Sequence, residues 1–194
     1  MGVIKTALEI ALEKTEKVKS DKSSVSQYEA RQKGVRIANA FLSGGIDIAD
    51  ELKKTSAQDR ESAKQGIFDV LVSQIALPVG KDGLEKLEKL GKGLSAVIKS
   101  GEFSAMYKQL LQICNQYTDE SENYENMIQQ QYAPNLRKKE EELSRRLGRE
   151  VRIDPLQDPE YIAFYNQHMG ALKGNYEPVV QQAREEAKRM FAGN

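Results

Sequence analysis

Two long stretches of the chain place apolar or aromatic side chains about every 3.5 residues, and this pattern constrains the fold most. Their positions are Phe103, Tyr107, Leu110, Cys114, Tyr117, Ser121, Tyr124 and Ile128, then Ile162, Tyr165, Met169, Leu172, Tyr176, Val179, Ala183 and Met190. Glu186 is the one discordant position of the second stretch. At about 1.5 Å per residue each stretch is roughly 40 Å long as a helix. The second half of the chain is therefore predicted to be a long antiparallel helical hairpin with coiled-coil-like heptads.

Shorter helices are expected in the first half, because glycine, proline and short polar residues interrupt it more often. Helices are expected over residues 3–18, 25–42, 47–54, 57–76 and 83–99, with a polar loop at 20–24 and a helix end at Gly44. The helix over 57–76 is apolar nearly all round and is expected to lie centrally. In the last of these helices Gly91 and Gly93 indicate a close helix crossing or a kink.

The predicted fold class is therefore all-α, an N-terminal bundle of short helices followed by the long hairpin. The bundle comprises residues 1–100 and the hairpin residues 101–194, either as two domains or as one continuous domain. Within the hairpin, Pro134 is expected to interrupt the first helix or to begin the next one. Gly148 is expected to end a helix, and Asp158 to cap a final helix that has Pro159 at its first position.

Composition disfavours several classes of protein. The 29 basic and 29 acidic residues balance, which argues against a dedicated nucleic-acid-binding or anionic-membrane protein. Glu9 and Glu13 interrupt the first residues where a secretory signal would be apolar, and no apolar run is long enough for a membrane span. The single cysteine, Cys114, cannot form an internal disulfide. These features predict a cytoplasmic protein without membrane association.

No set of residues in the sequence carries a recognisable chemistry. His168 is the only histidine, so zinc sites of the Cys/His type and di-iron helical bundles fail on residue count. The segments 80–83 and 91–93 contain glycine and lysine but do not fit the spacing of a phosphate-binding loop. We therefore expect no catalysis, no metal and no cofactor. An enzyme whose site is shared between chains is the one enzymatic alternative left open.

Two groups of residues are the candidate interaction sites. The first is the tyrosine-rich seam of the hairpin, with Tyr117, Tyr124, Tyr165 and Tyr176. The second is the stretch 137–152, which holds seven Lys or Arg against four Glu and includes Arg137, Lys138, Arg145 and Arg146. The acidic side chains of residues 140–142 lie at helical pairing distance from these basic ones, so internal ion pairs are expected.

The sequence thus predicts a non-catalytic helical protein–protein interaction protein or structural adaptor. Its partner would be another protein or a second copy of the chain. A homodimer could pair the acidic residues of 119–125 in one copy with the basic stretch 137–152 of the other. The alternative is an RNA- or ribosome-associated helical factor that binds through residues 137–152.

Overall fold

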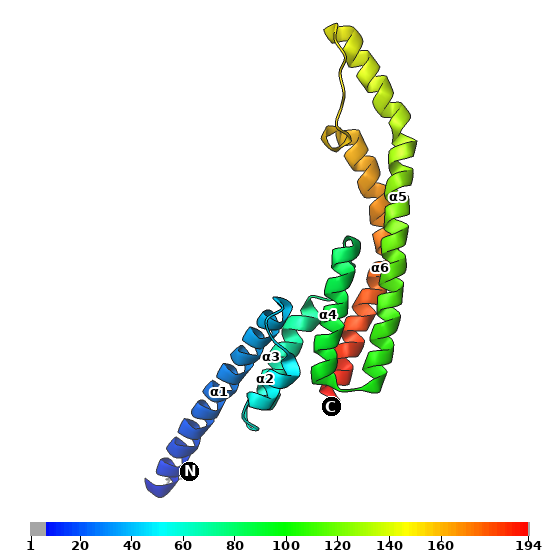
Figure 1. Cartoon of the computed structure of the whole chain (residues 1–194). Coiled ribbons are helices and arrows are strands. Elements are labelled where there is room, and N and C mark those ends of the chain that lie inside the picture. Colours follow the sequence, from blue (N-terminus) through cyan, green and yellow to red (C-terminus); the bar gives the residue numbers. More distant parts are fainter. Residues whose placement is uncertain (1–6, 194) are drawn as a thin grey trace, which may run out of the picture. The chain divides into compact units, whose positions relative to one another are not determined.

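The computed structural model describes the backbone of residues 7–193 and the side chains of residues 24–193. Within that part the chain is 84% α-helical, with six α-helices and no strand (Figure 1). The helices are α1 (Ala7–Leu42), α2 (Ile48–Lys54), α3 (Arg60–Ser73), α4 (Gly80–Ile98), α5 (Gly101–Leu147) and α6 (Pro159–Ala192). A short 3-10 turn, Pro155–Gln157, precedes α6. The all-α prediction is confirmed.

The chain divides into two compact units that are not consecutive in sequence. Unit 1 contains the residues up to Gln74, Lys89–Phe103 and the residues from Lys188 onward. Unit 2 contains Ile75–Glu88 and Ser104–Ala187. The predicted division into residues 1–100 and residues 101–194, as two domains or as one continuous domain, stays a prediction.

Two predicted helix interruptions are wrong. The expected loop at 20–24 lies inside α1, which is one helix from Ala7 to Leu42. Serine, aspartate and lysine each disfavour a helix by only about 0.5 kcal/mol relative to alanine. No glycine or proline is present there to stop it. Residues 3–6 of the expected first helix lie outside the described residues. The end of α1 is as predicted, because the helix ends at Leu42 and Gly44, in the turn that follows, has a φ of 88°.

Pro134 is the second corrected interruption, because α5 runs through it from Gly101 to Leu147. Proline removes one backbone hydrogen bond and normally costs a helix interior about 3 kcal/mol. Here Ile128 and Tyr132 before it and Leu136 after it belong to one apolar cluster with Tyr161 of α6. Packing on both sides of the proline therefore keeps the helix continuous.

In unit 1, α1 and α3 cross at glycines that bring their backbones into contact. A Cβ atom on Gly34 would lie 2.0 Å from the carbonyl oxygen of Ala63, and one on Gly66 would lie 2.1 Å from that of Arg31. A Cβ atom on Gly93 of α4 would lie 2.7 Å from the side chain of Leu71, in agreement with the predicted close crossing. Only glycine permits the two backbone approaches at Gly34 and Gly66, because a backbone oxygen cannot move aside as the end of a side chain can.

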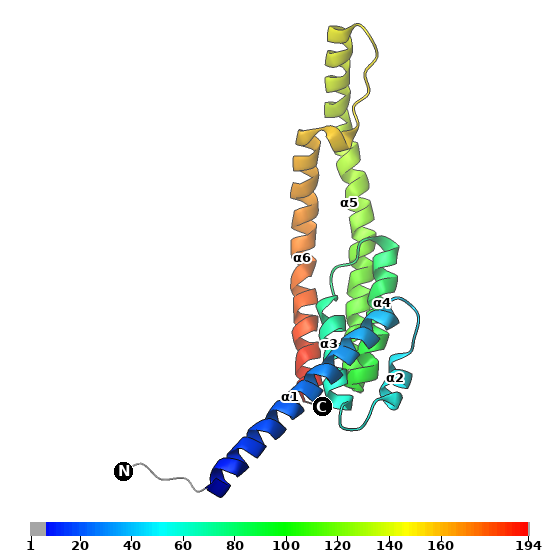
Figure 2. The ribbon, with the colours of Figure 1, turned by 90° about the vertical axis from the view of Figure 1, so that its left-hand side faces the viewer.

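In unit 2, aromatic pairs show that α5 and α6 run antiparallel. Tyr117 contacts Tyr176 with ring centroids 5.2 Å apart, and Tyr132 contacts Tyr161 at 5.3 Å. Beyond the start of α6, α5 continues and residues 148–158 return along it (Figures 1 and 2).

The register of α6 differs from the predicted seam. Ile162 is 40% exposed and its neighbour Tyr161 only 4%, so Tyr161 takes the inward position. The buried residues of α6 are Tyr161, Leu172, Val180, Ala183 and Ala187. Of the predicted seam positions, only Leu172 and Ala183 are among them, because an ideal α-helix drifts away from a strict 3.5-residue repeat.

Candidate interaction sites

The four predicted seam tyrosines are largely engaged within unit 2. The ring of Tyr117 packs on Tyr176, the hydroxyl of Tyr176 hydrogen-bonds Glu120, and Tyr124 is half-buried on α5. The hydroxyl of Tyr165 donates to Oε1 of Glu125 at 2.7 Å. That hydrogen bond, together with burial, raises the pKa of Tyr165 to about 12. These side chains therefore join α5 to α6 and present little free surface to a partner.

A cluster of four polar side chains joins the last third of α5 to the start of α6. We name Tyr132, Lys139, Asp158 and Glu160 the junction cluster. Nζ of Lys139 lies 2.8 Å from each carboxylate oxygen of Asp158 and 2.9 Å from Oε2 of Glu160. The hydroxyl of Tyr132 donates to Oδ2 of Asp158 at 2.9 Å. Asp158 is only 5% exposed, so its charge depends on these partners.

The electrostatics of the junction cluster follow from the same contacts. The hydrogen bond from Lys139 lowers the pKa of Asp158, and the bond to Asp158 raises the pKa of Lys139. Oδ1 of Asp158 also accepts the backbone N–H of Glu160 at 3.1 Å, so the predicted cap of the final helix is confirmed. No pattern in the sequence indicated that Lys139 pairs with Asp158, because 19 residues separate the two.

The return segment 148–154 is held to α5 by two side chains that accept its backbone hydrogen bonds. Ser144 accepts the N–H of Val151, and Glu140 accepts that of Ile153, each at 2.9 Å. The ion pairs expected for the acidic residues 140–142 do not form as predicted. Glu140 bonds the return segment, and Lys139 pairs with Asp158 and Glu160.

The basic side chains at the end of α5 are consequently uncompensated. Arg137, Lys138, Arg145 and Arg146 are all exposed, and none makes an ion pair within the described part of the chain. Leu147, the last residue of α5, is 56% exposed among them. We name Arg145, Arg146, Leu147 and the exposed Arg149 the basic end; it combines unpaired positive charge with exposed apolar surface.

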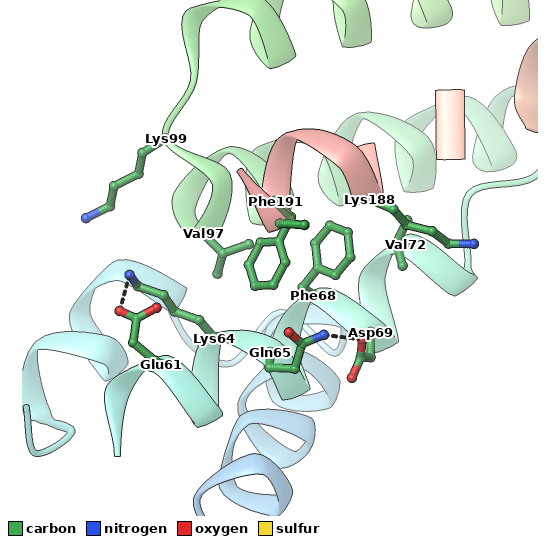
Figure 3. Close-up of a pocket in the computed structure, with 11 residues that line it drawn as sticks. Glu61, Lys64, Gln65, Phe68, Asp69, Val72, Val97, Lys99, Lys188 and Phe191 are labelled. Atoms are coloured by element: carbon green, nitrogen blue, oxygen red, sulfur yellow. Dashed lines mark hydrogen bonds and ion pairs between the residues drawn. The ribbon is translucent and has the colours of Figure 1, made fainter. Parts of the chain in front are cut away.

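Unit 1 carries a groove of about 710 Å³ that the sequence did not indicate (Figure 3). The rings of Phe68 and Phe191 stack face to face in it, with centroids 4.1 Å apart and planes 6° from parallel. Its other lining residues are Glu61, Lys64, Gln65, Asp69, Val72, Val97, Lys99, Lys188 and Ala192. Phe68 lies in α3 and Phe191 near the end of α6, so no local pattern connects them.

Cys114 and His168, whose side chains could carry conventional catalytic chemistry, lie on different helices, α5 and α6. Cys114 is fully buried, and burial raises the pKa of its thiol to about 11, which keeps it protonated and unreactive. The His168 ring packs on Phe164 with centroids 4.4 Å apart. Among the described residues no three His, Cys, Asp or Glu side chains gather as a metal would require. No described helix is long and apolar enough to span a membrane.

Residues 49–189 match a protein family of unknown function, DUF6657. The chain belongs to this family. The part shared with DUF6657 begins in α2 and contains the junction cluster, the basic end and α3 to α5 in full, while α1 and Phe191 lie outside it. No curated protein and no solved structure was found to be similar to the chain.

Proposed function

We propose that this member of DUF6657 is a non-catalytic helical protein that binds another protein through the basic end of α5. The observation that carries the proposal is the exposure of Arg145, Arg146 and Arg149 around Leu147, which is 56% exposed. Arginine is enriched in protein interfaces, and an exposed leucine gains free energy when a partner covers it. The partner surface would be acidic with an apolar patch.

The junction cluster supports this proposal, because it makes the basic end a rigid element. Lys139 and Asp158 connect α5 to α6, and Ser144 and Glu140 hold the return segment. A binding surface that is already ordered loses less conformational entropy when it binds. We therefore expect the geometry of the basic end to depend on the junction cluster.

The test is affinity isolation from a native cell lysate followed by mass spectrometry, with three variants. Leu147→Ser and the double variant Arg145→Gln/Arg146→Gln should lose partners that the unmodified chain captures. The control Lys81→Gln/Lys92→Gln removes the same charge from exposed positions on α4 and should retain them. A set of captured proteins that is the same for all of these chains would contradict the proposal.

An RNA- or ribosome-associated factor is the second candidate, again through residues 137–152. It is favoured by the absence of ion pairs on Arg137, Lys138, Arg145 and Arg146 within the described part. The stretch contains no aromatic side chain on which a base could stack, which favours the protein partner instead. Capture that ends after nuclease treatment, and RNA binding that weakens steeply with salt, would support the RNA factor.

A second copy of the chain is a further candidate partner. Of the acidic residues proposed to meet the basic stretch, Glu120 and Glu125 bond tyrosines of α6, which leaves Asp119 and Glu122 exposed. The charge available to fix a dimer is therefore smaller than the sequence suggested. Light scattering at micromolar concentration tests it: a mass near 21.8 kDa at low and at high salt would contradict self-association.

A further inference from the structure

The groove of unit 1 combines an aromatic floor with a rim whose net charge is positive. The stacked rings of Phe68 and Phe191 lie beside Val72 and Val97 (Figure 3). Phe68 is 3% exposed, whereas Phe191 is only half-buried and so presents apolar surface to the groove. The volume of the groove, about 710 Å³, is in the range of small-ligand sites and admits a few side chains of a partner.

The acidic groups of the rim are neutralised inside unit 1. Glu61 pairs with Lys64 at 2.7 Å. Asp69 accepts hydrogen bonds from Arg31 and from Gln65, the latter at 2.8 Å. Lys99 is exposed and makes no ion pair within the described part of the chain. With Lys188 also on the rim, the groove and Arg31 together carry four basic side chains against two acidic ones.

The backbone of Lys99 adopts the left-handed conformation that ends many helices. Lys99 lies between α4 and α5 with a φ of 50°, the one non-glycine residue with positive φ in the described part. This conformation costs a lysine about 1 kcal/mol relative to glycine. Its backbone N–H bonds the carbonyl oxygen of Ser95 at 3.1 Å, so this conformation closes the end of α4 and places the Lys99 side chain on the rim of the groove.

We propose that the groove is a docking site for an acidic segment of a partner protein that carries a phenylalanine or leucine. The apolar side chain packs against the half-buried face of Phe191, and carboxylates of the segment pair with Lys99 and approach Lys188. This site is separate from the basic end and does not depend on the function proposed for it. Together the two surfaces give one chain two sites for partners, which is the property of an adaptor.

The experiment uses the full chain labelled with ¹⁵N and three synthetic peptides. The probe is acetyl-Glu-Asp-Phe-Leu-Asp-Glu-amide; its controls replace the acids with Gln and Asn, or with Lys. We expect saturable shifts of the amide signals of Phe68, Lys99 and Phe191 with the acidic peptide. The neutral peptide should bind about two- to fivefold more weakly, since each exposed ion pair contributes little. The basic peptide should not bind.

Two variants separate binding from folding. Phe191→Ala should weaken binding about tenfold, as expected for an aromatic side chain at the centre of an interface. Lys99→Gly removes the charge and relieves the strain, so it should weaken binding about two- to fivefold while leaving the melting temperature unchanged or higher. Lys81→Gln, which removes a lysine outside the groove, should bind as the unmodified chain does.

Several results would overturn the docking site. They are the absence of binding by the acidic peptide, equal binding of the neutral or the basic peptide, and shifts confined to residues outside the groove. Unchanged affinity in Lys99→Gly would also overturn it, and this variant remains decisive if Phe191→Ala does not fold.

Discussion

Unit 1 and unit 2 hold their helices together in different ways. In unit 1, Gly34 and Gly66 let the backbones of α1 and α3 touch among mainly aliphatic contacts, and among the described side chains only one ion pair, between the partly exposed Arg31 and Asp69, joins the same two helices. In unit 2, tyrosine hydroxyls and a lysine of α5 or α6 bond carboxylates of the facing helix or its cap. The stability that steric contact provides depends on side-chain volume and hardly on pH. The stability that a hydrogen-bonded carboxylate provides depends on its charge, and so on pH.

The comparison explains why a tyrosine-rich seam can join two long helices. Each hydroxyl has a defined partner, Glu125 for Tyr165 and Asp158 for Tyr132, so register is fixed by hydrogen bonds as well as by packing. Such bonds to a charged group contribute about 2 kcal/mol each. Because each depends on a single partner, the loss of one side chain should loosen unit 2 locally. Four predictions test this difference, from the largest expected effect to the smallest.

Gly66→Ala should have the largest effect, because its Cβ would lie 2.1 Å from a backbone oxygen that cannot move alone. Overpacking at a rigid contact costs about 3 kcal/mol or more, so unit 1 should unfold at much lower denaturant concentration. The matched control is Gly170→Ala in α6, where no atom lies within 4 Å. This control should stabilise the chain by about 0.5–1 kcal/mol. If both variants were equally stable, the steric account of unit 1 would be wrong.

Asp158→Ala should have the next largest effect, confined to unit 2. It removes the cap of α6 and leaves Tyr132 and Lys139 without their shared partner. Hydrogen bonds to a charged group contribute about 2 kcal/mol, so amide exchange should accelerate in residues 148–165. Glu160→Gln is the control, because the side chain of Glu160 is 76% exposed. The loss of an exposed ion pair should change exchange little. Faster exchange throughout unit 1 would contradict a local role.

Acid should loosen unit 2 through the same residue. The pKa of Asp158 is lower in the folded chain than in the unfolded one, mainly because of its bond from Lys139. Its contribution to stability is therefore complete above the unfolded pKa of about 3.9 and is lost as pH falls through the lower folded value. Protection factors in residues 148–165, which are exchange rates corrected for the intrinsic effect of pH, should fall between pH 6 and about pH 3, and Asp158→Asn should reduce that dependence. A pH profile identical in Asp158→Asn would exclude Asp158 as its source.

Tyr165→Phe should have the smallest effect, a loss of about 1.5 kcal/mol at neutral pH, the low end for a bond to a charged group, because only one part-buried hydrogen bond is removed. The pKa of Tyr165, raised to about 12, gives a second readout. The bond stabilises the folded chain fully below the unfolded pKa of about 10 and is lost as pH rises through about 12. The pKa values of Tyr107, Tyr132 and Tyr176 are raised as well. Tyrosinate absorbance should therefore show one late-titrating group fewer in Tyr165→Phe, and no such loss in the exposed control Tyr28→Phe.

The sequence alone determined the features that depend on residues a few positions apart. The helical class, the helix end at Gly44, the end of α5 before Gly148 and the cap of α6 by Asp158 were all readable. Capping and helix propensity act within about one turn, so neighbouring residues decide them. The exposure of Arg145 and Arg146 also agrees with their position on a charged helix face.

Only the tertiary structure decided which distant side chains meet. Lys139 joins Asp158 across 19 residues, and Phe68 of α3 stacks on Phe191 of α6, with no periodicity to indicate either pair. The heptad pattern selected a face of α6 but placed Ile162 inward where Tyr161 lies, because a straight helix drifts away from a 3.5-residue repeat. Likewise, packing on both sides of Pro134 kept α5 continuous against the local preference of proline to break a helix, since the contacts of Tyr132 and Leu136 with α6 outweigh one lost hydrogen bond.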